Sequence, residues 1–383
     1  MKHSYIAKRF QSSAAGLSLD TEALAKYKDI IDLSIGDTDF TTDESIINAA
    51  FRDAKAGHTH YGDPKGDPEL IDAVCRAWEE DFGQRLPRDH VLVSASSCLG
   101  MALVMLAILD PGDEVIVFSP YFPMYREQIE LAGGVCVDVP TYASEDYAID
   151  EARLRAAITP RTKAIVFNNP TNPTGMGYDG KTLELLARVA QEHDLLIAAD
   201  EIYTTYLYEG DFIPLRTIPG LAHRVITLNS FSKNFLMTGW RVGVAIAEPE
   251  LLNVMSNINN SLIYTAPSIS QRAAIQALAI RQTIREKYVL AYRDRIFYAA
   301  DRMEQIPYLS LVRPKGTFYL FPGIEKTGLS AEDFCQALLE RAHVLVTPGT
   351  LFGSTGAGHF RIACTVGLDR LKEAFDRMEG LSF

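Results

Sequence analysis

The sequence predicts an α/β protein whose larger domain contains a mostly parallel sheet, of a seven-stranded type, between helices. Between residues 90 and 247, short apolar segments rich in β-branched residues alternate with amphipathic segments of helical spacing. Parallel strands joined by crossover helices produce this alternation, because helices cover both faces of the sheet. From residue 309 the pattern changes to shorter strand-like runs. A chain of 383 residues is long enough for two domains, so we expect a second, smaller α+β domain.

The expected elements follow from these runs in chain order. In the large domain we expect strands at 90–93, 114–118, 135–139, 164–167, 195–199, 225–228 and 242–247. We expect helices at 19–28, 44–56, 68–82, 98–109 and 180–194, and a long helical region from 267 to about 305. The small domain should add strands at 30–36, 318–321, 344–346 and 360–364, with a helix at 331–342. We therefore place the large domain at 46–284 and the small domain at 1–45 plus 285–383.

Composition excludes several classes of function. The formal net charge of −12 and the absence of a basic run argue against a nucleic-acid partner. The five cysteines are scattered without CxxC spacing, which favours reduced thiols over a metal site or a disulfide framework. The first 13 residues lack the apolar core of a signal peptide, and the most apolar run, 101–109, is too short to span a bilayer. We expect a cytoplasmic protein with no membrane partner and no metal.

One stretch, Asn229–Arg241, combines a lysine with hydroxyl groups and an arginine. We expect Lys233 to lie in a hydroxyl-rich loop directly after an apolar strand. A partly desolvated lysine loses its proton more readily and can form imines. Ser230, Ser232 and Arg241 are group types that bind a phosphate. Alone, this pattern would indicate only a solvated turn.

Other polar residues follow further strands, where ligands bind in an open parallel sheet. Ser96, Ser97 and Cys98 begin one helix, Asn172 lies in a doubled Asn-Pro turn, and Asp200 ends an apolar strand. Read singly, each has an ordinary explanation, such as a helix cap or a turn.

One ligand would use all of these groups: a cationic heteroaromatic ring that carries a phosphate and an aldehyde. Asp200 would pair with the protonated ring nitrogen, while Asn172 and Tyr203 would hydrogen-bond a ring hydroxyl. Phe122 would stack on the ring, unless it belongs to the core. Lys233 would bind the aldehyde. Pyridoxal 5'-phosphate is such a ligand, and its ring withdraws electrons from a bound amine.

Three motifs then carry a family resemblance. N-N-P-T-N-P-T-G at 168–175, A-D-E-I-Y at 199–203 and S-F-S-K-N-F-L-M-T-G-W-R-V-G at 230–243 resemble the class I/II aminotransferases. These are fold type I enzymes that use pyridoxal phosphate. The resemblance covers nearly the whole chain, from I-G-D-T-D-F at 35–40 to F-R-I-A at 360–363.

The resemblance implies roles for individual residues. Lys233 would form the Schiff base with the cofactor and then shuttle a proton to and from the substrate Cα. Arg361 would bind the substrate α-carboxylate, with the backbone of Gly36 against that group, although an internal ion pair is the alternative for the arginine. Tyr61 would reach the phosphate in a neighbouring subunit, which implies a homodimer with shared sites. Asp200, Asn172 and Tyr203 keep the ring contacts named above.

Two positions depart from the family pattern. Ser96-Ser97 stands where many relatives carry glycine, which affects how closely the backbone approaches the phosphate. Cys98 stands where some aspartate-using relatives carry a lysine for the distal carboxylate, and a thiol is a poor partner for a carboxylate. We therefore expect an amino acid with a neutral or apolar side chain rather than aspartate or prephenate.

Three functions are compatible with this residue set. The leading one is ping-pong transfer of an amino group between an L-amino acid and a 2-oxo acid. The alternative is a lyase or cyclase on the same fold, in which the substrate loses a group at Cβ or Cγ. A regulatory module that only binds the cofactor is disfavoured, because no basic helix-turn-helix precedes Gly36.

Overall fold

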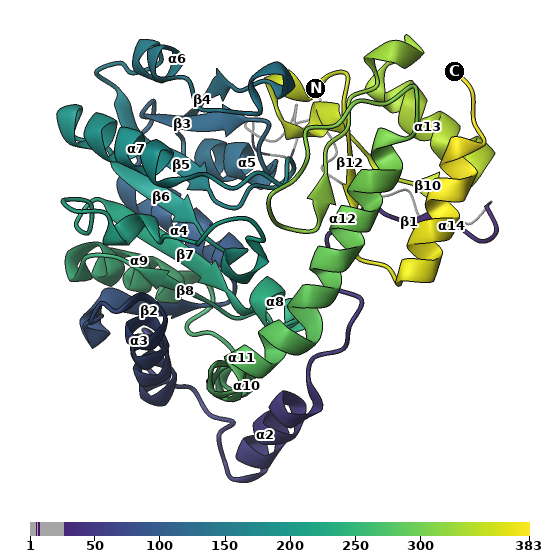
Figure 1. The fold of residues 1–383 in the computed structure, drawn as a ribbon. Helices are drawn as coiled ribbons and strands as arrows, with labels where there is room; N and C mark the ends of the chain where they lie inside the picture. Colours follow the sequence, from purple (N-terminus) through teal and green to yellow (C-terminus); the bar gives the residue numbers. More distant parts are fainter. Residues whose placement is uncertain (1–4, 6, 8–26) are drawn as a thin grey trace.

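The computed structural model describes residues 5, 7 and 27–383, and its largest sheet has seven strands (Figure 1). The strands lie in the order β2-β8-β7-β6-β5-β3-β4. All neighbours are parallel except β8, which is antiparallel to both β2 and β7. The predicted mostly parallel sheet is confirmed. The bounds are β2 Val91–Ser94, β3 Glu114–Ser119, β4 Val135–Pro140, β5 Thr162–Asn168, β6 Leu196–Asp200, β7 Val225–Ser230 and β8 Gly243–Ile246.

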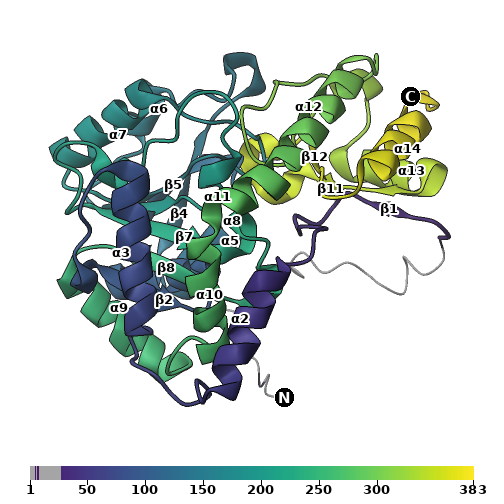
Figure 2. The same cartoon turned by 60° about the horizontal axis from the view of Figure 1, so that its bottom comes forward.

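Helices cover both faces of this sheet, because successive strand residues point to opposite sides. Val115 and Val117 pack in one cluster with α4 (Ser97–Ile108), α5 (Met124–Leu131) and α9 (Pro249–Leu262). Ile116 packs on the other face with α6 (Glu151–Ala156) and α7 (Gly180–Glu192). A third cluster joins β2 and β8 to α2 (Glu44–Lys55), α3 (Pro68–Phe82) and α10 (Ser268–Ala279). Figure 2 shows α2 alongside α10. Both faces are thus buried, as near-continuous apolar strands require.

A second core lies around two small sheets. β1 (Ile31–Asp32) pairs in parallel with β10 (Val344–Leu345), and β11 (Thr347–Pro348), β12 (Phe360–Ala363) and β9 (Tyr319–Leu320) form an antiparallel sheet. Their buried residues pack against α12 (Leu290–Glu304), α13 (Ala331–Ala342) and α14 (Leu368–Glu379). The long helical region comprises α10, α11 (Arg281–Ile284), a π-helical turn at Arg285–Val289 and α12. The domain limits at 46–284 and 1–45 plus 285–383 stay a prediction.

Two expectations about local structure were wrong. The strand expected at 30–36 is only the two-residue β1, because the backbone from Ser34 to Gly36 bonds to side chains of the cavity instead. Lys233 lies on the short helix α8 (Phe231–Asn234) rather than in a loop, because the Ser230 hydroxyl caps that turn. The helix expected at 19–28 lies almost wholly outside the described residues. Within those residues, no helix is both long and apolar enough to cross a membrane.

Candidate active site

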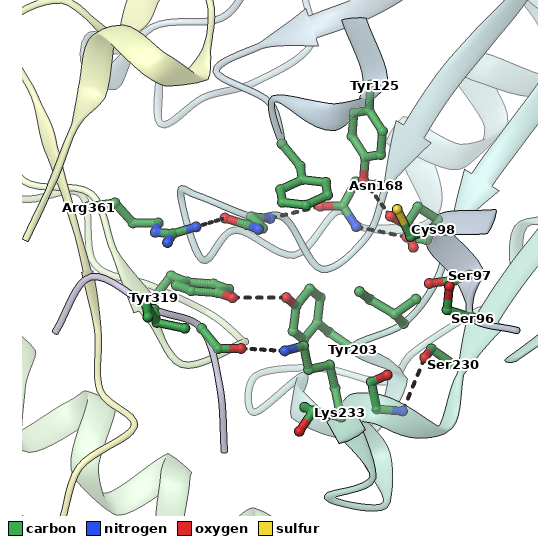
Figure 3. Close-up of a pocket in the computed structure, with 18 of the residues that line it drawn as sticks. Ser96, Ser97, Cys98, Tyr125, Asn168, Tyr203, Ser230, Lys233, Tyr319 and Arg361 are labelled. Carbon is green, nitrogen blue, oxygen red and sulfur yellow. Dashed lines mark hydrogen bonds between the residues drawn. The ribbon is translucent and has the colours of Figure 1, made fainter. Parts of the chain in front are cut away.

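A cavity of about 790 Å³ lies beyond the carboxyl ends of β5, β6 and β7, where the two cores meet (Figure 3). The sequence predicted this position, because ligands of an open parallel sheet bind beyond the carboxyl ends of its strands. All but one of the residues predicted to bind cofactor or substrate line it: Gly36, Ser96, Ser97, Cys98, Phe122, Asn172, Asp200, Tyr203, Ser230, Ser232, Lys233, Arg241 and Arg361. The exception is Tyr61.

Lys233 projects from α8 into this cavity. The Ser230 hydroxyl accepts from the Ser232 amide at 3.1 Å and so fixes the turn that carries the lysine. Lys233 Nζ donates to the carbonyl of Gly36. Burial lowers the pKa of Lys233 to about 8; the carboxylate of Asp37 opposes this shift, and the cations Arg361 and Arg241 add to it. About a tenth of the amine is therefore unprotonated at pH 7, far more than for a lysine with the ordinary pKa, and an imine-forming lysine requires this neutral form.

Asp200 lies at the end of β6 with only 7% of its surface exposed. Its Oδ2 accepts from Tyr125 Oη at 2.5 Å, whereas Oδ1 is buried and has no partner among the described residues. Burial raises the pKa of Asp200 to about 6, and the Tyr125 hydrogen bond partly offsets this shift. A buried carboxylate oxygen without a donor is costly, so Oδ1 is a site where a cationic N–H group would be strongly favoured.

Arg361 on β12 is buried, with 6% of its surface exposed. It donates to Asn172 Oδ1 at 3.1 Å and to the carbonyl of Ser34 at 2.6 Å, and its guanidinium lies 4.6 Å from the centre of the Tyr319 ring. Its Nε has no hydrogen-bond partner, and among the described residues its acceptors are an amide oxygen and a carbonyl rather than a carboxylate. The internal ion pair that the sequence left open is therefore not found there, and a buried guanidinium without a counter-ion suits a bound carboxylate.

The start of α4 and the segment that follows α8 border another part of the cavity. Ser96 caps α4, whose first N–H groups and dipole favour an anion. A Cβ at Gly243 would lie 2.7 Å from the Ser97 nitrogen, so glycine there allows close backbone approach. Arg241 lines the same cavity and donates to the carbonyl of Thr238 at 2.7 Å. Cys98 is the second residue of α4 and also lines the cavity, and burial raises the pKa of its thiol.

Two aromatic predictions have different outcomes. Tyr203 is buried, its Oη lies 3.2 Å from Tyr319 Oη, and burial raises its pKa. Tyr61 lies outside the cavity with 84% of its surface exposed, and its ring packs edge-on against Tyr264 at 4.9 Å. The role of Tyr61 in a partner subunit stays a prediction.

Sequence reasoning missed several cavity residues. Asn168 donates to the carbonyl of Asp200 and accepts from the amide of Asn172, both at 2.8 Å, and thereby joins the ends of two strands. It ends β5 and pairs in register with Asp200, so the search for polar residues at strand ends could have found it. Tyr125 and Tyr319 carry no local signal, since one lies on a helix and the other on β9. No three His, Cys, Asp or Glu side chains gather as metal ligands in the described part of the chain.

The fold and this cavity define the class of protein: an α/β enzyme whose buried amine, acid and guanidinium surround one cavity at the carboxyl ends of parallel strands. Residues 28–378 match the family model described as aminotransferase class I and II. The chain belongs to this family, so the predicted resemblance, the fold and the aminotransferase class of activity are confirmed.

Similar proteins span nearly the whole chain. The arginine–pyruvate transaminase of Pseudomonas aeruginosa is 34% identical over 99% of this chain and 97% of its own. The aspartate/prephenate aminotransferase of Thermus thermophilus is 37% identical over 91% of this chain and 90% of its own. Among solved structures, a double mutant of the Thermus thermophilus aspartate aminotransferase superposes with a TM-score of 0.93 at 34% identity, covering 98% of this chain and 99% of that one.

Proposed function

We propose that this enzyme transfers an amino group between an L-amino acid and a 2-oxo acid, with pyridoxal 5'-phosphate held in the cavity. The observation that carries the proposal is the lowered pKa of Lys233 in the same cavity as the unpartnered Oδ1 of Asp200. A reactive amine and an unpaired buried acid are what an aldehyde with a protonated ring nitrogen requires.

The residues present fit this cofactor. Asp200 Oδ1 would accept from the ring nitrogen, and the start of α4 with Ser230 and Arg241 would hold the phosphate. Phe122 would lie against the ring, and Asn172 and Tyr203 would approach its oxygen. The volume of about 790 Å³ is within the usual range for a cavity that holds a cofactor together with a small substrate.

When bound, the cofactor supplies an electron-withdrawing ring that acidifies the Cα hydrogen of the amino acid. Arg361 orients the substrate by its α-carboxylate, in competition with its present acceptor, the carbonyl of Ser34. Lys233 Nζ would remove the proton from Cα, deliver it to the cofactor and reverse both transfers in the second half-reaction, because its pKa of about 8 suits both directions. Asp200 would stay ionised beside the cationic ring nitrogen, while the hydrogen bond from Tyr125 holds its carboxylate in place.

A group of exposed apolar side chains supports a homodimer. Leu262, Ile263, Tyr264 and Tyr61 all expose more than a third of their surface, and Tyr61 packs directly on Tyr264. We propose that this apolar face meets a second copy, so that Tyr61 of one subunit reaches the phosphate of the other. Size-exclusion chromatography with light scattering would give a single monomeric mass if the proposal is wrong.

A single-turnover experiment tests the activity. The loaded protein is mixed with each of a panel of L-amino acids in the absence of a 2-oxo acid, and the cofactor absorbance and the 2-oxo acid product are followed. We expect one equivalent of 2-oxo acid per site and none from Lys233→Ala. Pyruvate and ammonia in excess of one equivalent from substrates with a Cβ leaving group would favour the lyase instead.

A further inference from the structure

A segment without helix or strand, Ser34–Thr42, crosses between the two cores directly over Lys233. It begins next to Leu33, which packs in the core of the C-terminal part, and ends at α2. Two of its backbone carbonyls contact the functional side chains: Gly36 accepts from Lys233 Nζ, and Ser34 accepts from Arg361. The position of this backbone therefore sets where both side chains lie.

The two ends of the segment are fixed by their own contacts. At the first end, the carbonyls of Ser34 and Ile35 accept from Thr347 at 3.0 Å and Thr365 at 3.1 Å. At the other end, Thr42 donates to the carbonyl of Leu236 at 2.7 Å and accepts from the Trp240 indole at 3.0 Å. Between these ends, a Cβ at Gly36 would overlap the Tyr319 ring, so the backbone there fits closely.

The middle of the segment is held by Asp39. Arg295 of α12 donates to Asp39 Oδ1 at 2.7 Å, and Tyr292 Oη donates to the same oxygen at 2.8 Å. Tyr292 Oη also lies 3.2 Å from the Asp39 amide, which donates to it. The Arg295 guanidinium lies 4.8 Å from the centre of the Phe40 ring, a favourable cation–π distance. Asp39 is thus bonded through both its backbone and its side chain.

The charge balance makes this contact strong. The Arg295 side chain is only 9% exposed, and Asp39 is its only ion-pair partner among the described residues. The Asp39 side chain is 29% exposed, so the pair is partly buried. Removing Asp39 would leave the buried Arg295 guanidinium without a counter-ion, which costs more than losing a surface pair. Between the anchored ends of the segment, Asp39 is therefore the residue held by an ion pair, three residues from Gly36.

We propose that the Asp39–Arg295 pair is a positioning device, which holds Ser34–Thr42 so that the Gly36 and Ser34 carbonyls bind Lys233 and Arg361 in their active places. Neither residue lines the cavity, so neither touches substrate or cofactor. The expected effect of the pair on substrate binding rests on the proposed function. Its expected effect on the pKa of Lys233 does not.

The direction of the effect on Lys233 follows from the neighbouring groups. A carbonyl that accepts from an amine stabilises the ammonium form more than the neutral form. Asp37, on the same segment, also raises the pKa of Lys233, whereas burial, Arg361 and Arg241 lower it. If the segment loosens, the carbonyl and Asp37 both act less on Nζ, but the amine also gains solvent. Because burial is the largest cause of the lowered pKa, the loss of burial decides the sign and the pKa of Lys233 should rise toward its ordinary value.

The experiment compares Asp39→Asn, Arg295→Met and the double variant with Asp376→Asn. Asp376 of α14 accepts at 2.7 Å from Arg302, which lies on α12 like Arg295. This control therefore removes an ion pair to the same helix that does not involve the segment, and Arg302 keeps Glu379 as a second partner. We expect KM for the amino donor to rise about tenfold in all three test variants, with kcat changed less than threefold. Equal effects in the single and double variants would show that the two residues act as a pair.

A second measurement does not depend on activity. Trace labelling of Lys233 with acetic anhydride across pH, read by mass spectrometry on the full chain without added cofactor, gives the pKa of the amine. We expect a pKa about 0.5 higher in the test variants, because Nζ gains solvent, and an unchanged pKa in Asp376→Asn. If stability falls but KM and the Lys233 pKa stay unchanged, or if Asp376→Asn shifts them equally, the pair is only structural. If the protein does not transfer amino groups, the labelling still measures the pKa of Lys233. Failure of the proposed function and failure of this inference can therefore be distinguished.

Discussion

The buried carboxylate of Asp200 should make the cofactor-free protein less stable than it could be. An ionised carboxylate with one unpartnered buried oxygen is disfavoured relative to its protonated form, which is why burial raises the pKa of Asp200 to about 6 from its usual 3.8. Asparagine has the same shape and no charge, and its oxygen can still accept from Tyr125 Oη. Asp200→Asn should therefore stabilise the protein in the absence of cofactor while it weakens cofactor binding.

The sign and size of this effect follow from proton linkage. Because the folded-state pKa is raised, the folded protein binds more protons than the unfolded chain between about pH 4 and pH 6. The contribution of protonated Asp200 to folding stability is complete below the pKa of the unfolded state and is lost as pH rises through about 6. A difference of about 2.2 in pKa means that Asp200 lowers the free energy of unfolding by at most ~3 kcal/mol at pH 8 and by ~1.6 kcal/mol at pH 5, relative to a group that is always neutral. The advantage of the variant should thus shrink by roughly 1.4 kcal/mol between these pH values.

Chemical denaturation of the full chain without cofactor, at pH 8 and pH 5, measures this difference. Asp369→Asn is a suitable control, because the Asp369 side chain is fully exposed and its variant should follow the wild type at both pH values. With pyridoxal 5'-phosphate added, the order should reverse, since the ligand stabilises the wild type more. An Asn variant that is less stable at pH 8, with a gap that does not depend on pH, would refute the reasoning.

Three further substitutions test the other parts of the site. Arg361→Lys replaces a planar two-point donor with a point charge and should raise KM for amino donors by about 30- to 100-fold in initial-rate assays; an unchanged KM would place the carboxylate elsewhere. Cys98→Lys should raise kcat/KM for dicarboxylic donors at least about tenfold relative to apolar ones, and a wild type that already prefers aspartate would contradict the neutral side-chain expectation. Tyr61→Phe should weaken cofactor affinity about fivefold in equilibrium dialysis, because one hydrogen bond to a charged group is lost; full affinity in the variant would remove Tyr61 from the phosphate site.

The large sheet and the location of the site could be predicted because local patterns determine them. Strands buried on both faces must be apolar throughout, so their ends are visible wherever a polar residue follows. Asp200 and Lys233 both stand out by this criterion, and they line one cavity because parallel strands end at the same edge. The exact form of the turn that carries Lys233 was not visible, since a single capping hydroxyl on Ser230 converts a loop into α8.

The residues that were missed act across long separations in the chain. Tyr125 reaches Asp200 from 75 residues away, and Arg295 reaches Asp39 from 256 residues away. Neither contact has a sequence period, because each depends on how a helix packs against the rest of the molecule. Patterns of residues thus locate the groups that react, whereas the groups that fix their positions and proton affinities emerge only when distant helices are in place. This division explains why Asp39, which looks like an ordinary turn residue in the sequence, can control two side chains that it does not touch.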